Sequence, residues 1–399
     1  MNRCALGFVT AAFLIVLADA RAEIQLVGQC SIPANATDKS GLTDKLADGT
    51  PHNEMGSLGS AIAYTGAGNR YVMLADRGPK DGAVPFHCRF HVVDILFDPP
   101  GFLKSELVET HILNDKSGRP FVGHASQIDA AKTGHRLDPE GARLSAAGTL
   151  FVSDEYGPHV MEFDAAGKLI RELPMPKRFR VRRPHAEPAK ELADNKHGRA
   201  PNKGMEGLAI TPDGRKLVGI MQGPLIQDGA HHGTNVRILE MDLSSGNSRE
   251  FLYPLEHEKT GVNEILAVND HEFLVLERTG GGDPAAPRSA RIYKIDITRA
   301  TDISALDALP HKSIPKGVVP VAKTLFIDLI DPRHGLAGPD FPAKIEGLAF
   351  GPDLIDGRHL LLVTSDNDFT SAPTRIFAFA IESRDLPGFQ RQETLRLKR

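Results

Sequence analysis

Short runs of alternating apolar and polar residues dominate this chain, and one arrangement of such runs returns several times. Each copy has an apolar stretch, a tight turn, a second apolar run that closes in a polar cluster, and a third run. The third copy shows this plainly, with runs at 206–210, 217–224 and 236–243 and a turn at 212–214. Alternation over about four to eight residues predicts β-strands, whose successive side chains point to opposite faces of a sheet.

Five copies can be read, and they begin near residues 59, 140, 206, 264 and 346. Short strands joined by turns such as Pro-Asp-Gly, returning at intervals longer than one hairpin, favour four-stranded blades around an axis. We therefore predict an all-β fold, a single β-propeller. The stretch 300–342 holds either a lone outer strand near 324–328 or part of a sixth blade. The segment 23–32 has no partner of its own and would close the ring as the outer strand of the last blade.

Four of the five copies carry a glutamate at the start of the first strand. These residues are Glu140, Glu206, Glu264 and Glu346, whereas the first copy has Ser60. The first strands of a propeller line its central channel, so the carboxylates would form a ring around one mouth. Carboxylates held this close repel one another and either raise their pKa values or take up a cation such as Ca²⁺. Hydrogen bonding between neighbouring blades is the alternative role for each glutamate.

The second run of each copy ends in a polar cluster that should face the same mouth. The clusters are Asp76-Arg77, Asp154-Glu155-Tyr156, Gln222, Glu277-Arg278 and Asp366-Asn367-Asp368. We predict that the four glutamates bind a divalent cation together with Asp154 or Asp366. In a hydrolase, Glu206 and Asp154 would be catalytic, and Arg77 and Arg278 would hold the anionic oxygens of the ester.

A strongly basic insertion, from Pro176 to Lys203, separates the second and third copies. Folded over the acidic mouth, it would supply the cationic side of a site for an anionic substrate such as a phosphate ester. A solvated surface loop is the alternative.

The start of the chain has the features of a secretory signal peptide: Arg3, an apolar stretch at 5–18, and alanines at 20 and 22. The apolar stretch is shorter than the roughly 20 residues that a membrane span needs. We predict a signal peptide at 1–22 and one propeller domain at 23–399, periplasmic or secreted. Cys30 and Cys88 remain after cleavage, and in an oxidising compartment they predict one disulfide, with two unpaired thiols as the alternative.

Composition narrows the functions by exclusion. Lys and Arg number 47 against 51 Asp and Glu, and Trp is absent, so neither a nucleic-acid groove nor a stacking platform for sugars is indicated. The chain has no Gly-x-Ser-x-Gly nucleophile motif, Walker loop or dinucleotide fingerprint. Its 16 histidines show no zinc spacing such as His-Glu-x-x-His.

Several segments, taken in order, resemble one protein family. They are Asp138-Pro-Glu-Gly141, Ser153-Asp-Glu-Tyr-Gly-Pro158, Asn202-Lys-Gly-Met-Glu-Gly-Leu-Ala209, Ile345-Glu-Gly-Leu-Ala349 and Thr364-Ser-Asp-Asn367. The chain is similar here to the phytase-like proteins described as having esterase-like activity of phytase, from about residue 56 to 379. The resemblance implies an exported propeller with phosphatase or esterase activity and cation dependence. Ser60 departs from the glutamate of the other copies, which leaves the ring incomplete.

The predicted function is hydrolysis of phosphate or carboxylic esters, with a Ca²⁺-like ion that polarises the ester and activates water. The expected substrate is a small anionic ester, and neither a nucleic acid nor a membrane is an expected partner. The competing class is a non-catalytic propeller that binds a ligand or protein at the same mouth. The sequence does not determine the oligomeric state.

Overall fold

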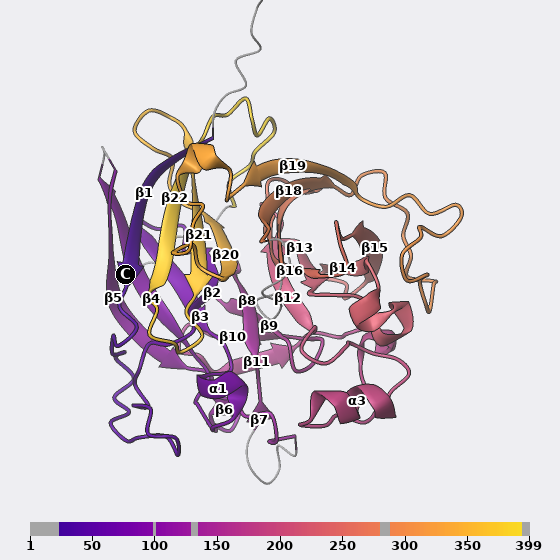
Figure 1. Cartoon of the computed structure of the whole chain (residues 1–399), viewed down its shortest axis with the longest axis horizontal. Helices are drawn as coiled ribbons and strands as arrows, with labels where there is room; N and C mark the ends of the chain where they lie inside the picture. The colour runs from indigo at the N-terminus through magenta and orange to yellow at the C-terminus, as the bar shows by residue number, and fades with distance from the viewer. Residues whose placement is uncertain (1–23, 99–100, 129–134, 280–287, 393–399) are drawn as a thin grey trace, which may run out of the picture.

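The computed structural model describes residues 24–98, 101–128, 135–279 and 288–392, and these form five four-stranded blades arranged in a ring (Figure 1). The predicted all-β propeller is confirmed. The stretch 300–342 contains one strand, β19, which is the outer strand of the fourth blade. The number of blades in the described part of the chain is therefore five.

Each blade runs from an inner strand at the channel to an outer strand at the rim. The first blade comprises β2 (Leu58–Tyr64), β3 (Arg70–Ala75), β4 (Arg89–Asp98) and β5 (Phe102–Ile112); the second comprises β8 (Pro139–Leu144), β9 (Leu150–Asp154), β10 (His159–Phe163) and β11 (Leu169–Glu172). The third comprises β12 (Met205–Ile210), β13 (Lys216–Met221), β14 (Asn235–Asp242) and β15 (Ser248–Pro254); the fourth comprises β16 (Thr260–Ala267), β17 (Glu272–Thr279), β18 (Ala290–Asp296) and β19 (Ala322–Asp328). The fifth comprises β20 (Lys344–Phe350), β21 (His359–Asp366), β22 (Thr374–Ile381) and β1 (Gln25–Ile32).

The ring is closed by strands from the two ends of the described chain. Strand β1 pairs antiparallel with β22 from Gln25 opposite Ala380 to Ile32 opposite Thr374, and the indigo and yellow strands lie side by side in Figure 1. The closure predicted for the segment 23–32 is confirmed. This pairing covers the edge of β22. A strand edge left open can pair with another chain and lead to aggregation.

Apolar faces pack between neighbouring blades and form the core. One buried cluster includes Leu74 and Val152 and so joins the first and second blades. Another includes Leu58 and Leu362 and joins the first blade to the fifth. Burying such surfaces is the main favourable term in folding, so each blade depends on its neighbours for stability.

The predicted disulfide is wrong, because Cys30 and Cys88 are both free. The two residues pack into different interfaces: Cys30 lies between the fifth and first blades, and Cys88 between the first and second. The Cys88 thiol lies 3.3 Å from the Leu137 carbonyl oxygen and donates a hydrogen bond to it. Burial raises the pKa of the Cys30 thiol to about 11, which keeps it protonated and unreactive.

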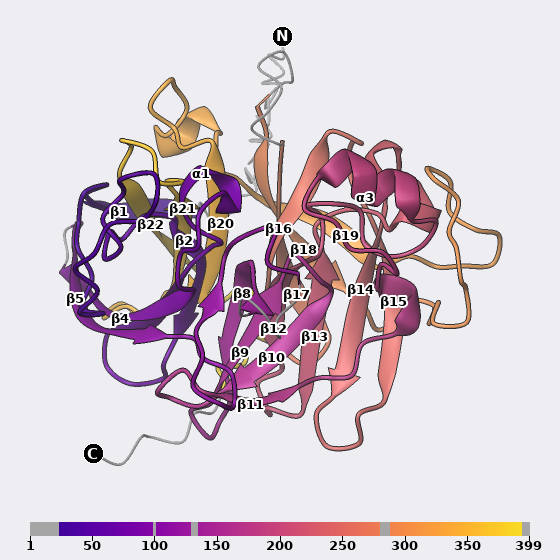
Figure 2. The same cartoon turned by 90° about the horizontal axis from the view of Figure 1, so that it is seen from below.

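Short helices and two-residue strands lie in the segments that connect the blade strands, both within blades and between them. They are β6 (Phe121–Val122), β7 (His135–Arg136), α1 (Pro79–Gly82), α3 (Pro188–Asp194) and the 3₁₀ turns η1 (Lys177–Phe179), η2 (Ile226–Asp228), η3 (Ala230–His232) and η4 (Pro332–His334). Figure 2 shows α1 and α3 on the same side of the ring, at the top of that view. None of the helices in the described ranges has the length and apolar character of a membrane span. The expected signal peptide, residues 1–22, lies outside the described residues and stays a prediction.

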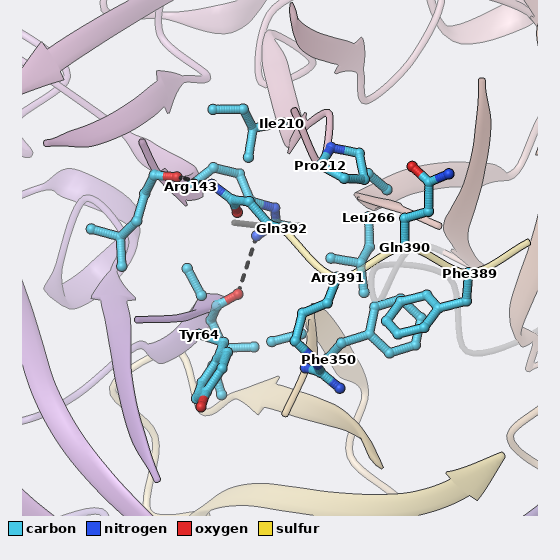
Figure 3. Close-up of a pocket in the computed structure, with 15 residues that line it drawn as sticks. Tyr64, Arg143, Ile210, Pro212, Leu266, Phe350, Phe389, Gln390, Arg391 and Gln392 are labelled. Atoms are coloured by element: carbon cyan, nitrogen blue, oxygen red, sulfur yellow. Dashed lines mark hydrogen bonds between the residues drawn. The ribbon is translucent and has the colours of Figure 1, made fainter. Parts of the chain in front are cut away.

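The C-terminal segment covers one end of the channel. A pocket at that end is lined by residues 389–392 and by the last residues of the inner strands, including Leu144 and Phe350 (Figure 3). Gln392 Nε2 donates a hydrogen bond to the Leu144 carbonyl oxygen at 2.7 Å, and the Gln390 N–H donates to that of Val268 at 2.9 Å. The inner strands begin at the opposite end, so the predicted glutamates lie at the other mouth.

Candidate functional site

Every blade has a β-bulge where its inner strand begins. In the third blade, Met205 pairs with Met221 and Gly207 with Ile220, so Glu206 is an extra residue without a partner. The same irregularity falls at Glu346 in the fifth blade and at Glu140 with its following glycine in the second. A bulge redirects the side chain of the extra residue, and bulges are common beside active sites. In this propeller they present carboxylates at one mouth of the channel.

In the fourth blade the extra residue is Asn263, because Val262 pairs with Glu277 and Glu264 with Leu276. In the first blade the bulge takes in Ser60. The residues at equivalent bulge positions are therefore Ser60, Glu140, Glu206, Asn263 and Glu346. Glu264 lies one residue further along its strand than the glutamates with which the repeat pattern aligned it.

Glycine occupies the position after the bulge in three blades, because the inner strands approach closely there. A Cβ atom on Gly141 would lie 2.6 Å from the Glu206 carbonyl oxygen, and one on Gly207 would lie 2.6 Å from the Ile265 backbone nitrogen. Such distances leave no room for a side chain. The fourth blade has Glu264 at this position, and its side chain must find space elsewhere.

The Glu264 carboxylate is buried beside Arg143, with its Oε2 3.0 Å from the guanidinium. Its Oε1 accepts hydrogen bonds from the backbone N–H groups of Leu208 at 3.1 Å and Ile265 at 2.9 Å. Arg143 also donates to the carbonyl oxygens of Ile62 at 3.1 Å and Ile265 at 2.8 Å. Burial raises the pKa of Glu264 to about 7. These contacts join four blades, which gives Glu264 an architectural role rather than a place among the clustered carboxylates at the mouth.

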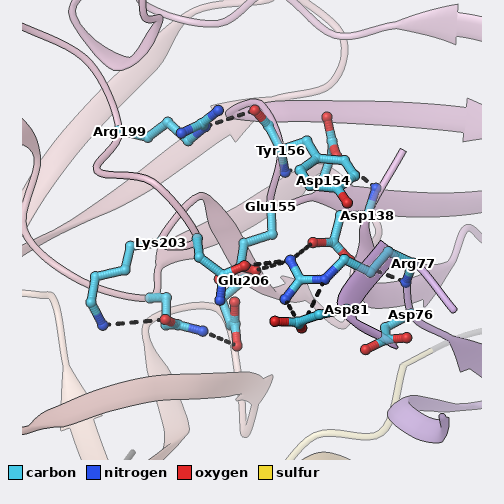
Figure 4. Close-up of polar contacts among 12 residues, drawn as sticks. Asp76, Arg77, Asp81, Asp138, Asp154, Glu155, Tyr156, Arg199, Lys203 and Glu206 are labelled. Carbon is cyan, nitrogen blue, oxygen red and sulfur yellow. Dashed lines mark hydrogen bonds and ion pairs between the residues drawn. The ribbon is translucent and has the colours of Figure 1, made fainter. Parts of the chain in front are cut away.

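Carboxylates from four blades gather at the mouth, and Figure 4 shows some of those from the first three. Three groups each offer oxygens that lie within 4.8 Å of one another: Glu140, Glu155 and Glu206; Asp76, Asp138 and Glu140; and Asp76, Asp366 and Asp368. Because Glu140 and Asp76 each belong to two groups, the three form one continuous arc, which we call the acidic arc. Glu140, Glu206 and Asp366 were predicted from sequence as metal ligands, and the structure brings them into this arc. Acidic groups of this kind can hold a cation.

Two fully buried oxygens of the acidic arc lack hydrogen-bond partners among the described residues. Within the described part of the chain, Glu155 Oε1 and Glu206 Oε2 are buried and accept no hydrogen bond, and the two residues are only 1% and 2% exposed. Burial and neighbouring carboxylates raise the pKa values of Glu140 and Glu206 well above the ordinary range, and raise that of Glu155 to about 7. Ionised carboxylates in such surroundings need compensating charges. Arg77 supplies one at Glu155 Oε2, and protons or a bound cation would supply the rest.

Arg77 and Arg278 both reach this mouth, and their guanidinium groups form ion pairs with carboxylates there. Arg77 donates to Asp138 and, at 3.3 Å, to Glu155 (Figure 4). Arg278 donates to Glu346 at 2.6 Å. Charge-assisted pairs of this kind hold the carboxylates in fixed orientations. Glu346 is therefore close to the acidic arc but is engaged by an arginine.

Two lysines also lie at the mouth. Lys344 Nζ is 3.1 Å from carboxylate oxygens of both Asp366 and Asp368, so its ammonium neutralises part of that end of the acidic arc. Lys203 Nζ donates to Gln222 Oε1 at 3.3 Å, and Gln222 Nε2 in turn donates to Glu206 Oε1 at 3.0 Å.

The basic insertion brings its last residues to the mouth. Asn202 accepts a hydrogen bond from Arg77, and Lys203 follows it directly. Farther from the mouth, Arg199 of the insertion pairs with Glu191 on α3, where both side chains are buried. The insertion thus combines an architectural part with a short segment that reaches the site.

Among the described residues, Asp154 is not part of the acidic arc; it fixes the backbone beside it. Its Oδ1 accepts from the backbone N–H groups of Asp138 at 2.9 Å and Tyr156 at 3.1 Å, and its Oδ2 accepts from that of Gly157 at 3.0 Å. Burial raises the pKa of Asp154 to about 6. Neighbouring residues of a strand face opposite ways. Because the hydrogen bonds fix Asp154 on one side, the Glu155 side chain points to the other, toward the mouth.

The sequence pattern did not single out Asp76, Asp138, Glu155 and Lys203 as site residues. Asp76 and Glu155 stood within the predicted polar clusters, and Asp138 begins the Asp-Pro-Glu-Gly segment, so a signal was present for those three. Lys203 stood at the end of a long basic run, with nothing in the run to distinguish it from its neighbours.

Comparison with known proteins adds a family and several similar chains. The sequence model of the phytase-like family, described as "Esterase-like activity of phytase", matches residues 53–369. An "Uncharacterized secreted protein" of the fungus Arthroderma benhamiae is 26% identical over 367 residues, covering 70% of this chain and 69% of its own.

Solved structures show a weaker likeness. The calcium-binding protein regucalcin of Agrobacterium tumefaciens is 11% identical, with a TM-score of 0.38, covering 86% of this chain and 95% of its own. A gluconolactonase of Xanthomonas campestris is 9% identical, with a TM-score of 0.39, covering 90% and 97%. TM-scores this low give no ground for transferring either protein's properties to this chain.

Proposed function

This chain belongs to the phytase-like family, and we propose that it is an ester hydrolase that works at the acidic mouth with a bound divalent cation. Phosphate and carboxylic esters are the proposed substrate class, and Ca²⁺ is the proposed ion. The family description supports the reaction type. The chemistry of the mouth supports the cation.

The observation that carries the proposal is the pair of orphaned oxygens, Glu155 Oε1 and Glu206 Oε2, in a group whose oxygens lie within 4.8 Å of one another. Hard cations bind several carboxylate oxygens at once, and Ca²⁺ does so in flexible geometries. Glu140, Glu155 and Glu206 fit such an ion and would hold it. When bound there, it would polarise an ester oxygen and lower the pKa of a water molecule.

The neighbouring side chains keep these ligands in place. Arg77 bridges Asp138 and Glu155, and Gln222 fixes Glu206 through its amide N–H. A carboxylate near the ion would accept the proton of the attacking water. Glu206 is the proposed acceptor: its Oε2 would hold the ion, and its Oε1, which accepts one hydrogen bond from Gln222, keeps a lone pair for the proton.

We propose further that the protein is exported. The first 22 residues carry a signal-peptide pattern, and the similar protein of Arthroderma benhamiae is named a secreted protein. Export would suit a Ca²⁺ site of moderate affinity, since extracellular Ca²⁺ sites bind the ion with dissociation constants of roughly 10⁻⁴ to 10⁻³ M.

The test is hydrolysis of p-nitrophenyl phosphate and p-nitrophenyl acetate by the mature protein, with chelator and then with added Ca²⁺. We expect turnover that chelator abolishes and Ca²⁺ restores. Glu206→Gln should lower it by about 10- to 100-fold, the loss typical when groups around a metal are changed. Glu240→Gln is the matched control, because Glu240 pairs with Lys216 and Arg249 away from the mouth.

Absence of turnover under every condition, with folded protein, would overturn the hydrolase proposal. The mouth would then be a binding site without catalysis, which is the competing class. Turnover that is equal in Glu206→Gln and wild type would place the reaction elsewhere.

A further inference from the structure

Lys203 differs from the other basic side chains at the mouth. Arg77, Arg278 and Lys344 all pair with carboxylates. Among the described residues, the hydrogen-bond partner of Lys203 Nζ is the neutral amide oxygen of Gln222, at 3.3 Å, and no carboxylate forms an ion pair with it. An ammonium group has three donors, so Lys203 keeps donors that the protein does not use.

The Lys203 side chain lies against two glycines, and one of them, Gly223, makes room for it. A Cβ atom on Gly223 would lie 2.7 Å from Lys203 Cδ, so the stem of the lysine lies against the backbone there. A Cβ atom on Gly261, at the start of β16, would lie 3.9 Å from Lys203 Nζ. The side chain is therefore held by the ends of two neighbouring blades. Such preorganisation lowers the entropy cost of binding a ligand.

Gln222 bridges the Lys203 ammonium and the Glu206 carboxylate. Its amide oxygen accepts from Lys203, and its amide nitrogen donates to Glu206 Oε1 at 3.0 Å, which links the two labelled side chains in Figure 4. A glutamate at position 222 would pair with the lysine directly. The amide instead leaves a positive group and a group of carboxylates side by side.

The surroundings of Lys203 favour an anion as its missing partner. Burial lowers the pKa of its ammonium, whereas Glu155 and Glu206 act in the opposite direction. Within the described ranges, no carboxylate forms an ion pair with this half-buried ammonium, so an anion bound from solution could take its remaining donors.

We propose that Lys203 is the anion-binding residue of this site, and that its ammonium takes an oxygen of a phosphate monoester bound beside the cation of Glu140, Glu155 and Glu206. This inference rests on the proposed function and narrows its substrate class from esters in general to phosphate monoesters. Gln222 is a positioning residue, because it acts through Lys203 and Glu206.

The test is calorimetric titration of inorganic phosphate into the mature protein loaded with Ca²⁺. Lys203→Met should bind phosphate about 10- to 100-fold more weakly, the worth of one hydrogen bond to a charged group. Lys203→Arg should retain most of the affinity, because it keeps the charge. Lys216→Met is the matched control and should bind as wild type, since Lys216 lies at the far end of β13 and pairs with Glu240.

A second variant keeps the test independent of how Lys203→Met folds. Gln222→Glu retains the lysine but gives it a carboxylate partner, so phosphate binding should weaken by a similar factor. Lys203→Met should also raise the KM for p-nitrophenyl phosphate and leave the KM for p-nitrophenyl acetate within about twofold.

Phosphate binding that is unchanged in Lys203→Met and Gln222→Glu would overturn the inference. So would a cation-loaded wild type that binds no phosphate. If that protein still hydrolyses the acetate ester in a cation-dependent way, the proposed function stands and the phosphate inference alone has failed.

Discussion

His91 on β4 is a fully buried histidine whose burial has a cost in acid. Its Nδ1 lies 3.0 Å from Thr110 Oγ1, and its Nε2 has no hydrogen-bond partner in the described chain. Burial lowers its pKa from an ordinary value of 6.5 to about 3. The first blade therefore holds a neutral imidazole over most of the acidic range.

We predict that His91 makes the folded protein less stable as pH falls. Below about pH 6.5 the histidine takes up a proton in the unfolded chain but stays neutral in the native state. Its contribution to the free energy of unfolding is therefore fully present above pH 6.5 and is lost as the pH falls toward 3. The loss is about 1.4 kcal/mol per pH unit. In urea unfolding at several pH values, the free energy of unfolding of His91→Gln should fall less steeply than that of wild type between pH 6.5 and 4. The difference in slope should be about 1.4 kcal/mol per pH unit. The exposed His197→Gln should keep the wild-type slope, and equal slopes for all three proteins would contradict the prediction.

At the scale of the elements, the inner strands pack closely enough that a single methyl group matters. The Gly207 Cα faces the backbone of β16, and an added Cβ would lie 2.6 Å from the Ile265 nitrogen. The same closeness at Gly141 sets β8 against β12. Backbone atoms cannot move aside as a flexible side chain can.

Gly207→Ala is predicted to destabilise the propeller by about 1 to 3 kcal/mol, the usual cost of overpacking. Gly261→Ala is the matched control, because its Cβ would meet its nearest neighbour at an ordinary 3.4 Å. Urea unfolding of the two variants measures the difference. Equal stability of Gly207→Ala and Gly261→Ala would show that the strands can separate at little cost.

The elements were predictable from sequence where periodicity governs them. Alternation and turns marked all five blades, and the leftover segment 23–32 pointed to the closing strand. Periodicity does not show a bulge, which shifts the pairing by one residue without changing the apolar pattern. The repeat therefore aligned Glu264 with Glu206, although Asn263 takes the bulge in that blade.

At the scale of the whole molecule, the site exists because the ring closes. Asp76 and Asp366 are far apart in sequence but adjoin in one group, since the closed ring sets β2 of the first blade against β20 and β21 of the fifth. The C-terminal segment covers the other end of the channel, so the acidic mouth is the end at which the site lies. The disulfide was mispredicted at this scale, because the compartment suggests a bond but only the packing of blades decides which cysteines meet.

The most direct test of the cation site is calorimetric titration of Ca²⁺ into chelator-treated mature protein. Wild type should bind the ion, and Glu155→Gln and Glu206→Gln should each weaken binding at least about 10-fold, as the loss of a charged ligand requires. Glu264→Gln should bind Ca²⁺ as wild type does, because Glu264 pairs with Arg143 and is not one of the proposed ligands. Wild-type protein that takes up no ion, or a Glu264→Gln variant as impaired as Glu206→Gln, would contradict the assignment of the cation to Glu140, Glu155 and Glu206.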